Sequence, residues 1–217
     1  MPPRFVIIDG NSLIHRAFHA LPMFRTADGI YTNAVYGFAN MLMKILEGFR
    51  PEYLAVAFDA GRVTFRNEVY QGYKADRKPT PPELSAQIPV VEDFLAAWGI
   101  KILKAQGYEA DDIIGTLAKS ATAQSFDLET LIVTSDRDVL QLVGGSIKAL
   151  LTNKGVSDMS VMDAAAVREK YGVGPEQIID LKALMGDKSD NIPGVAGVGE
   201  KIAVKLLILS ICFPDSK

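Results

Sequence analysis

Nine carboxylates fall where the sequence predicts strands to end or helices to begin. They are Asp9, Asp59, Glu109, Asp111, Asp112, Asp136, Asp138, Asp187 and Asp190. Three of these sites follow apolar runs typical of buried strands, at 5–8, 54–58 and 131–134. Because the carboxyl ends of strands in an open α/β sheet share one rim, we expect these side chains to face a common crevice.

Such a cluster repels itself. Two carboxylates about 4 Å apart repel by roughly 4 kcal/mol at an effective dielectric of about 20. Hard divalent cations with oxygen ligands are the expected means of neutralising it. Two Mg²⁺ or Mn²⁺ ions about 4 Å apart can activate a water and stabilise the leaving oxygen of an in-line displacement. The pattern therefore predicts a metal-dependent phosphoryl-transfer enzyme, in which some of the nine acids act through water or by holding other ligands.

Each group of acids also has an ordinary structural explanation. Asp111 and Asp112 lie at the start of a predicted helix, where capping and the helix dipole favour acids. Asp187 and Asp190 lie in a predicted turn, where aspartate is common. No pair is specific by itself. Three strand-end sites combined with two acid-rich turns favour a functional site.

Strand-like runs alternate with helix-like stretches in the first part of the chain. Strands are expected at 4–8, 53–58, 100–103, 130–134 and 146–151, and helices at 34–48, with Asn33 as N-cap, at 88–97 and at 110–121. This alternation predicts an α/β fold with a mainly parallel central sheet and helices on both faces.

From residue 163 onward only helices are expected. Asp163 can cap a helix to about Tyr171, Pro175 can open another to about Met185, and a third starts near Glu200. We therefore expect an α/β core over 1–160 and a helical subdomain over 161–217.

Residues 62–82 are rich in basic and aromatic side chains. The segment holds Arg62, Arg66, Lys74, Arg77 and Lys78, with Phe65, Tyr70 and Tyr73 interleaved. It ends in two prolines at 81–82, preceded by Pro79, which do not fit regular helix. We expect an excursion from the sheet that passes over the acidic rim, and a solvated basic loop is the alternative.

A Gly-Val-Gly turn at Gly197–Gly199, followed by Lys201 and Lys205, predicts a helix–hairpin–helix. Small residues let backbone N–H groups approach a phosphate, and the next helix N-terminus attracts the anion. Such a unit grips the nucleic-acid backbone without reading sequence. A purely structural corner is the alternative, and hairpin carbonyls that hold a monovalent cation, K⁺, are a weaker hypothesis.

The composition is that of an ordinary globular chain, with 48% hydrophobic and 23% charged residues. No apolar run approaches the roughly 20 residues of a membrane span. The single cysteine, Cys212, and the lack of a signal-peptide pattern favour the cytoplasm. The net charge is −3, but without the nine acids the remaining 17 acids face 23 Lys and Arg, which gives +6. An acidic pocket on a basic body suits a phosphodiester.

Other catalytic constellations find no support in the sequence. His15 and His19 fall at helix spacing and lack a cysteine partner set, so packing or surface roles are expected for them. Neither a Ser/His/Asp arrangement nor a Walker phosphate loop is found, which leaves acyl transfer and nucleotide hydrolysis unsupported.

Six short stretches, in order, resemble one family. They are Ile8–Leu13, Ala57–Asp59, Tyr73–Arg77, Tyr108–Asp112, Thr134–Asp138 and Gly186–Val195. Over about residues 4–207, the chain resembles the 5′-3′ exonuclease domain at the N-terminus of bacterial DNA polymerase I, within the 5′-nuclease and flap endonuclease superfamily of PIN-like fold. The resemblance weakens after Leu207, so 208–217 is expected to be a truncated or altered end.

The resemblance implies metal-dependent hydrolysis of DNA phosphodiesters near 5′ ends and flaps, as in primer removal and DNA repair. It implies that all nine acids form the site of two Mg²⁺ or Mn²⁺ ions. By this resemblance the tighter ion would be held mainly by Asp9, Asp59, Glu109, Asp111 and Asp136. The second ion would lie near Asp138, Asp187 and Asp190, and Asp112 would lie between the two ions.

The resemblance also implies roles for other side chains. Lys74 would stabilise the charge that develops on the scissile phosphate, and it is grouped with Asp111 and Asp136 as catalytic. DNA contacts are expected from Arg66, Tyr73 (stacking on a base), Lys74, Arg77, Gly197, Gly199 and Lys201.

Two alternatives to a 5′-nuclease stay open. One is a PIN-like ribonuclease, against which the basic segment and the hairpin argue. The other is a non-catalytic DNA-junction binding remnant, against which the intact acid set argues. The expected partner is DNA with a 5′ end, flap or junction, and no membrane; polymerase activity would come from another chain or a domain outside this sequence.

Overall fold

The structure is a computed structural model that describes residues 2–124 and 127–212. Its centre is a six-stranded sheet of order β3-β2-β1-β4-β5-β6, parallel except for the pairing of β6. The strands are β1 (Arg4–Asp9), β2 (Tyr53–Ala57), β3 (Lys101–Leu103), β4 (Glu129–Thr134), β5 (Ile147–Thr152) and β6 (Met159–Met162). The predicted mainly parallel sheet is confirmed, and β6 is an antiparallel edge strand that the sequence analysis missed.

The strand order reverses between β1 and β4. From β1 the chain adds β2 and β3 on one side of the sheet, then β4 and β5 on the other. A reversal of this kind opens a crevice at the carboxyl ends of the strands. Ile8 is in register with both Val56 and Val133, so the three central strands end at the same level. The strand-end acids Asp9, Asp59 and Asp136 therefore meet at this reversal.

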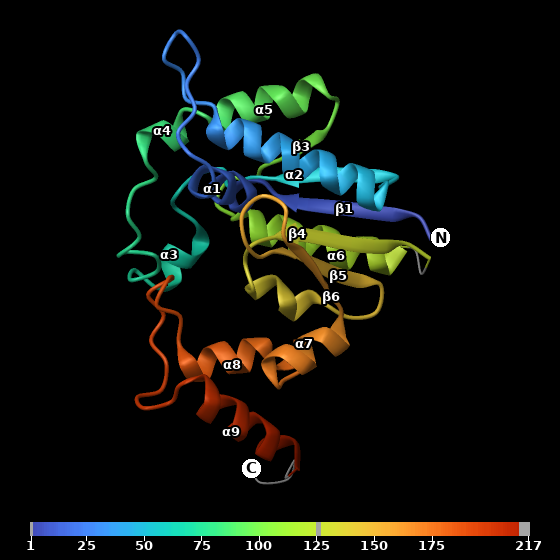
Figure 1. Cartoon of the computed structure of the whole chain (residues 1–217). Coiled ribbons are helices and arrows are strands. Elements are labelled where there is room, and N and C mark those ends of the chain that lie inside the picture. Colours follow the sequence, from blue (N-terminus) through green and yellow to red (C-terminus); the bar gives the residue numbers. More distant parts are fainter. Residues whose placement is uncertain (1, 125–126, 213–217) are drawn as a thin grey trace.

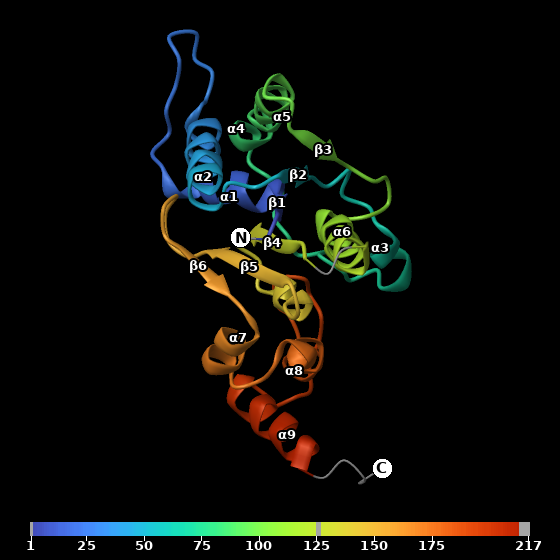
Figure 2. The ribbon, with the colours of Figure 1, turned by 90° about the vertical axis from the view of Figure 1, so that its right-hand side faces the viewer.

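Helices cover both faces of the sheet (Figures 1 and 2). One face packs on α1 (Gly10–Ala20), α2 (Asn33–Phe49) and α5 (Ile88–Ala97). The other face packs on α6 (Ala110–Gln124), and the apolar cluster of that face continues past the β6 edge into α7 (Ala164–Tyr171), α8 (Ile178–Met185) and α9 (Glu200–Cys212), where α9 packs on α8. Alternation along β1 explains the division, because Val6 and Ile8 pack on the first face and Ile7 on the second.

The remaining elements are short. They are α3 (Phe65–Val69), α4 (Pro82–Ser85) and two 3₁₀ helices, η1 (Asp138–Leu142) and η2 (Pro175–Gln177). The helix α9 continues through Cys212, and the rest of the expected altered end, 213–217, lies outside the described residues. Within the described ranges, no helix is both long and apolar enough to cross a membrane.

The cap of α2 differs from the prediction. Thr32, not Asn33, is the N-cap, and Asn33 is the first helical residue. Asn33 is fully buried, where its amide donates to Phe18 O at 3.0 Å and accepts from Gln87 Nε2 at 3.0 Å. These tertiary hydrogen bonds compete for the side chain that a cap would use. At α7 the predicted cap is found, because Asp163 accepts from Ala166 N at 2.9 Å.

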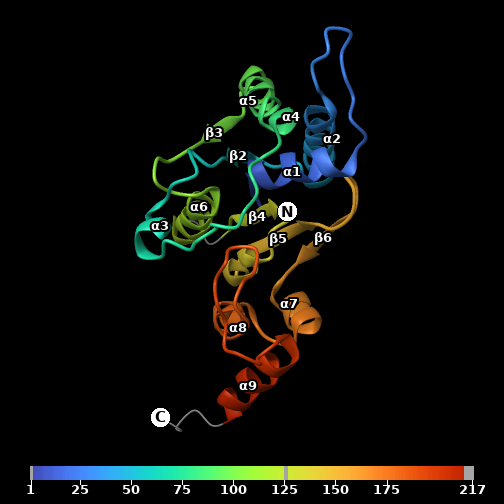
Figure 3. The ribbon, with the colours of Figure 1, turned by 90° about the vertical axis from the view of Figure 1, so that its left-hand side faces the viewer.

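Two segments close over the carboxyl edge of the sheet. Residues 62–82 run along it from α3 toward α4, and the loop 186–199 between α8 and α9 reaches it from the other side (Figures 1 and 3). They are joined where Lys74 N donates to Asp190 O at 3.0 Å and Asn191 Nδ2 donates to Gly72 O at 2.9 Å. The basic segment therefore lies over the acidic edge.

Gly10, directly after Asp9, has no room for a side chain. A Cβ there would lie 2.4 Å from Cε1 of Phe58, a ring that is only 1% exposed. We expect Gly10→Ala to lower the free energy of unfolding by about 1–3 kcal/mol, the usual cost of overpacking, as measured by urea denaturation.

The matched control is Gly48→Ala, since Gly48 lies in α2 with nothing within 4 Å of the added Cβ. Alanine there favours the helix by roughly 0.5–1 kcal/mol. Equal changes in the two variants would contradict the packing argument.

Candidate active site

All nine acids line two adjoining pockets at the carboxyl edge. The larger, of about 1350 Å³, is bordered by seven of them. The smaller, of about 800 Å³, adds Asp112 and Asp190. The residues common to both are Tyr73, Lys74, Glu109, Asp111, Asp136 and Asp138. The larger volume exceeds the roughly 300–1,000 Å³ of a small-molecule site, which suits a polymeric substrate.

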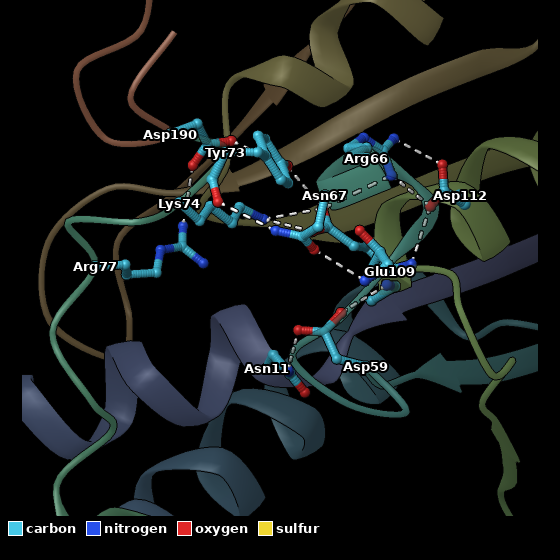
Figure 4. Close-up of polar contacts among 12 residues, drawn as sticks. Asn11, Asp59, Arg66, Asn67, Tyr73, Lys74, Arg77, Glu109, Asp112 and Asp190 are labelled. Atoms are coloured by element: carbon cyan, nitrogen blue, oxygen red, sulfur yellow. Dashed lines mark hydrogen bonds and ion pairs between the residues drawn. The ribbon is translucent and has the colours of Figure 1, made fainter. Parts of the chain in front are cut away.

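Backbone and neutral side chains fix the strand-end acids. Asp9 is 6% exposed and accepts from Ser12 N at 2.9 Å and from Thr134 Oγ1 at 2.7 Å. Asp59 accepts from Asn11 Nδ2 at 2.6 Å and from Ala110 N at 2.7 Å (Figure 4). Asp9 thus caps α1, while Asp59 ties the end of β2 to α1 and α6.

The basic segment supplies counter-charges to the acids near α6. Lys74 Nζ donates to both oxygens of Glu109 at 2.9 Å (Figure 4). Arg66 binds both oxygens of Asp112 at 2.8 Å, and this pairing lowers the pKa of Asp112. Two of the predicted DNA contacts therefore hold acids of the site in this structure.

Tyr73 and Arg77 are also turned toward the acids. The Tyr73 hydroxyl donates to Glu109 Oε2 at 3.0 Å and to Asp190 Oδ2 at 3.3 Å. Nη2 of Arg77 lies 3.4 Å from Oδ1 of Asp190. Because Tyr73 is only 8% exposed, its ring is not presented for stacking, and the stacking role stays a prediction that requires the ring to be uncovered.

Asp111 differs from the acids with basic partners. No hydrogen bond or ion pair is found for its carboxylate within the described residues, although it is exposed toward the crevice. Surrounding protein atoms, and then the charges of Asp9 and Asp136, raise its pKa to about 8. Burial likewise raises the pKa of Asp9 to about 6, against the hydrogen bonds from Ser12 and Thr134.

The charge balance of the crevice favours cations. The nine carboxylates outnumber the four basic side chains that are paired with them, those of Arg66, Lys74, Arg77 and Lys182. Oxygen donors are the ligands that hard divalent cations take. Within the described residues, however, no three acidic, imidazole or thiol side chains are gathered closely enough to hold an ion. The residues fit a divalent cation in donor type and charge, but the expected two-ion site is not preformed.

Several residues of the site carry little or no signal in the sequence. Lys182 of α8 pairs with two of the acids, and the only signal was a lysine five residues before Asp187. His15 and His19 line the larger pocket, and burial lowers the pKa of His15. Outside both pockets lie the exposed hairpin residues Gly197, Gly199 and Lys201.

Comparison with known proteins covers nearly the whole chain. Residues 4–172 match the family described as "5'-3' exonuclease, N-terminal resolvase-like domain", and residues 173–209 match "5'-3' exonuclease, C-terminal SAM fold". DNA polymerase I of Bacillus caldotenax is 53% identical over 95% of this chain, and that of Bacillus subtilis 52% over 94%. The chain spans about a quarter of these relatives, 23% of the length of each.

Solved structures show the same fold at lower identity. T5 5′-exonuclease with bound divalent metal ions (zinc) has a TM-score of 0.76 and 23% identity, covering 95% of this chain and 75% of that one. A T5 flap endonuclease complex with DNA and metal ions has a TM-score of 0.75 and 22% identity, with the same coverage. The catalytic core of Rad2 with DNA substrate has a TM-score of 0.61 and 20% identity, covering 95% of this chain and 60% of that one.

Asp111→Asn tests the crowding of charge in the crevice. Since the folded-state pKa of about 8 lies above the ordinary 3.8, ionisation of Asp111 costs stability progressively as pH rises between these values. The asparagine variant cannot ionise, so it does not lose this stability as the pH rises. We expect its melting temperature in EDTA to equal that of the wild type near pH 4 and to exceed it modestly by pH 8, because solvent in the crevice screens the effect.

Thermal denaturation in EDTA from pH 4 to 8 is the measurement. The control is Asp93→Asn, at an exposed aspartate of α5 that borders neither pocket. A gap between Asp111→Asn and the wild type that stays constant with pH would contradict the crowding argument.

Proposed function

The chain belongs to the 5′-3′ exonuclease family, and from this premise we propose that it is a divalent-metal-dependent, structure-specific 5′-nuclease. It hydrolyses DNA phosphodiesters near 5′ ends and flaps, as in primer removal and repair. The observation that carries the proposal is the crevice at the strand reversal, where nine acids meet under a basic segment.

The proposed substrate is DNA with a 5′ end, flap or junction. Arg62, Arg77 and Lys78 line the larger pocket together with seven of the acids, so a phosphodiester entering it would meet positive as well as negative charge. The names of the T5 and Rad2 complexes, which hold DNA, support this class of substrate. The exposed turn Gly197–Gly199 and Lys201 would grip duplex backbone outside the crevice, and K⁺ bound by its carbonyls would strengthen that grip.

The proposed setting follows from the relatives. They are DNA polymerases I of about four times this length, of which this chain matches 23%. Polymerase activity would come from another chain or from sequence outside these 217 residues. The proposed place of action is the cytoplasm.

Two Mg²⁺ or Mn²⁺ ions are the proposed cofactors. Asp9, Asp59, Glu109, Asp111 and Asp136 would hold one, and Asp138, Asp187 and Asp190 the other, with Asp112 between. Bound there, the ions supply a water of lowered pKa and charge stabilisation for both oxygens of the displacement. The carboxylates of the chain would contribute by holding them in the crevice.

Lys74 is the proposed electrostatic stabiliser of the reaction. Lys74 borders both pockets, its Nζ is paired with Glu109, and its side chain is 22% exposed, so the ammonium could also reach a phosphate bound in the crevice. A positive charge aimed at the developing negative charge acts most strongly in such a partly dry site. Tyr73 orients Glu109 and Asp190 through its hydroxyl, and Arg66 fixes Asp112.

The decisive assay uses 5′-flap DNA labelled at its 5′ end, with the purified chain in Mg²⁺ and in EDTA. We expect a short labelled product only in Mg²⁺, and we expect Asp136→Ala to abolish it while circular dichroism stays unchanged. Asp93→Ala, outside both pockets, is the matched control. Folded wild-type protein that binds the flap without cleaving it would establish the junction-binding alternative, and preferred cleavage of RNA would establish a ribonuclease.

Lys74→Ala tests the role of the ammonium. We expect kcat on flap DNA to fall by about 10²–10³-fold, the effect of removing one stabilising donor, with a smaller change in KM. Single-turnover kinetics measure the chemical step directly. Lys119→Ala, at the rim of the smaller pocket and away from the acids' ion pairs, is the control. An equal fall in kcat for Lys74→Ala and Lys119→Ala would show that any positive charge near the crevice has this effect, and would contradict a specific role for Lys74.

A further inference from the structure

One ammonium group joins the two halves of the acid cluster. Lys182, on α8, donates to Asp187 Oδ2 at 2.5 Å and forms an ion pair with Asp138 Oδ1. Asp138 begins η1, just after β4, whereas Asp187 lies in the loop that follows α8. Ser189 donates to the other oxygen of Asp187, Oδ1, from its backbone N at 2.8 Å and from its Oγ at 2.6 Å. Lys182 therefore links the α/β core to the loop 186–199.

This ion pair lies within the crevice itself. Lys182, Asp138 and Asp187 all border the larger pocket, as does Asp136, whose Oδ1 accepts from Asp138 N at 2.9 Å. The Lys182 side chain is 37% exposed, so its contacts can open into water. A lysine ammonium is ordinarily charged at neutral pH, so Lys182 brings a positive charge to both carboxylates.

Lys182 differs from the other basic partners of the acids. Arg66 holds Asp112 with a rigid two-pronged fork and lies 3.9 Å from Glu109, an acid of the same helix start, and Lys74 contacts Glu109 alone. Lys182 holds two acids from two separate elements through a compact charge on a flexible stem, an arrangement that rearranges readily. Its departure would free two carboxylates at once and would release the loop from η1.

We propose that Lys182 is a positioning residue that withholds Asp138 and Asp187 from a divalent cation until the cation displaces its ammonium. The inference rests on the proposed metal-dependent function. An ammonium and a divalent cation on the same two carboxylates repel each other, so only one occupies them at a time. The ion pair stabilises the acids when metal is absent, and metal binding is coupled to the position of the loop 186–199.

The test is Mn²⁺ binding to the 217-residue chain, measured by calorimetry and by electron paramagnetic resonance. Lys182→Met keeps the apolar stem and removes the charge. We expect it to bind Mn²⁺ roughly tenfold more tightly at the weaker site, which corresponds to about 1.4 kcal/mol. We also expect a lower melting temperature than wild type in EDTA and a difference that closes in saturating Mn²⁺.

Three further variants sharpen the result. Lys188→Met is the matched control, at an exposed lysine of the same loop that borders neither pocket, and it should behave as wild type. Lys182→Arg keeps the charge and should retain the weaker Mn²⁺ binding. Lys182→Gln keeps one hydrogen-bond donor without charge, and it takes the place of the Met variant if that variant does not fold.

Two results would overturn the proposal while the metal-dependent function stands. Unchanged Mn²⁺ affinity, with the melting temperature lowered equally in EDTA and in Mn²⁺, would show that the ion pairs of Lys182 persist when metal is bound. Weaker Mn²⁺ binding in the uncharged variants would show that Lys182 arranges the acids for the ion. A wild-type chain that binds no Mn²⁺ would overturn the proposal together with the metal-dependent function.

Discussion

Repulsion among carboxylates at the strand reversal is the constraint on which the rest of this structure depends. The sheet order delivers Asp9, Asp59 and Asp136 to one edge, and no rearrangement of side chains alone can disperse them. The charges are balanced by segments distant in sequence, residues 62–82 on one side and α8 on the other. The same ion pairs that hold the acids therefore hold these segments over the edge.

The sequence predicted the features that depend on short-range pattern. Apolar runs ending in aspartate identified β1, β2 and β4, and the shared rim of an open sheet then placed their acids together. It did not predict β6, a four-residue edge strand in which only Met162 is buried and which carries little periodic signal. Asn33 was misread for a related reason, since its amide is taken by Phe18 and Gln87, which no local pattern reveals.

Partners of the acids were beyond prediction because pairing is set by the tertiary fold. Nothing near Lys182 in sequence indicates Asp138, which lies 44 residues earlier and reaches it only because η1 packs beside α8. Tyr73 was expected to stack on a base, yet its ring is buried where residues 70–77 meet the loop 186–199, and its hydroxyl points to Glu109 and Asp190. Residue type was predictable, whereas the direction of the side chain was not.

An acid site without preformed ion positions is compatible with the proposed chemistry. Four basic side chains pair with five of the nine acids, which lowers the repulsion among the carboxylates when no ion is bound. Two divalent ions would compete with the lysines for the same carboxylate oxygens. Each lysine that an ion displaces stays in the crevice that a phosphodiester must enter. Its positive charge there attracts the negative phosphate. The groups that stabilise the empty site are thereby placed to bind substrate once the ions have taken their carboxylates.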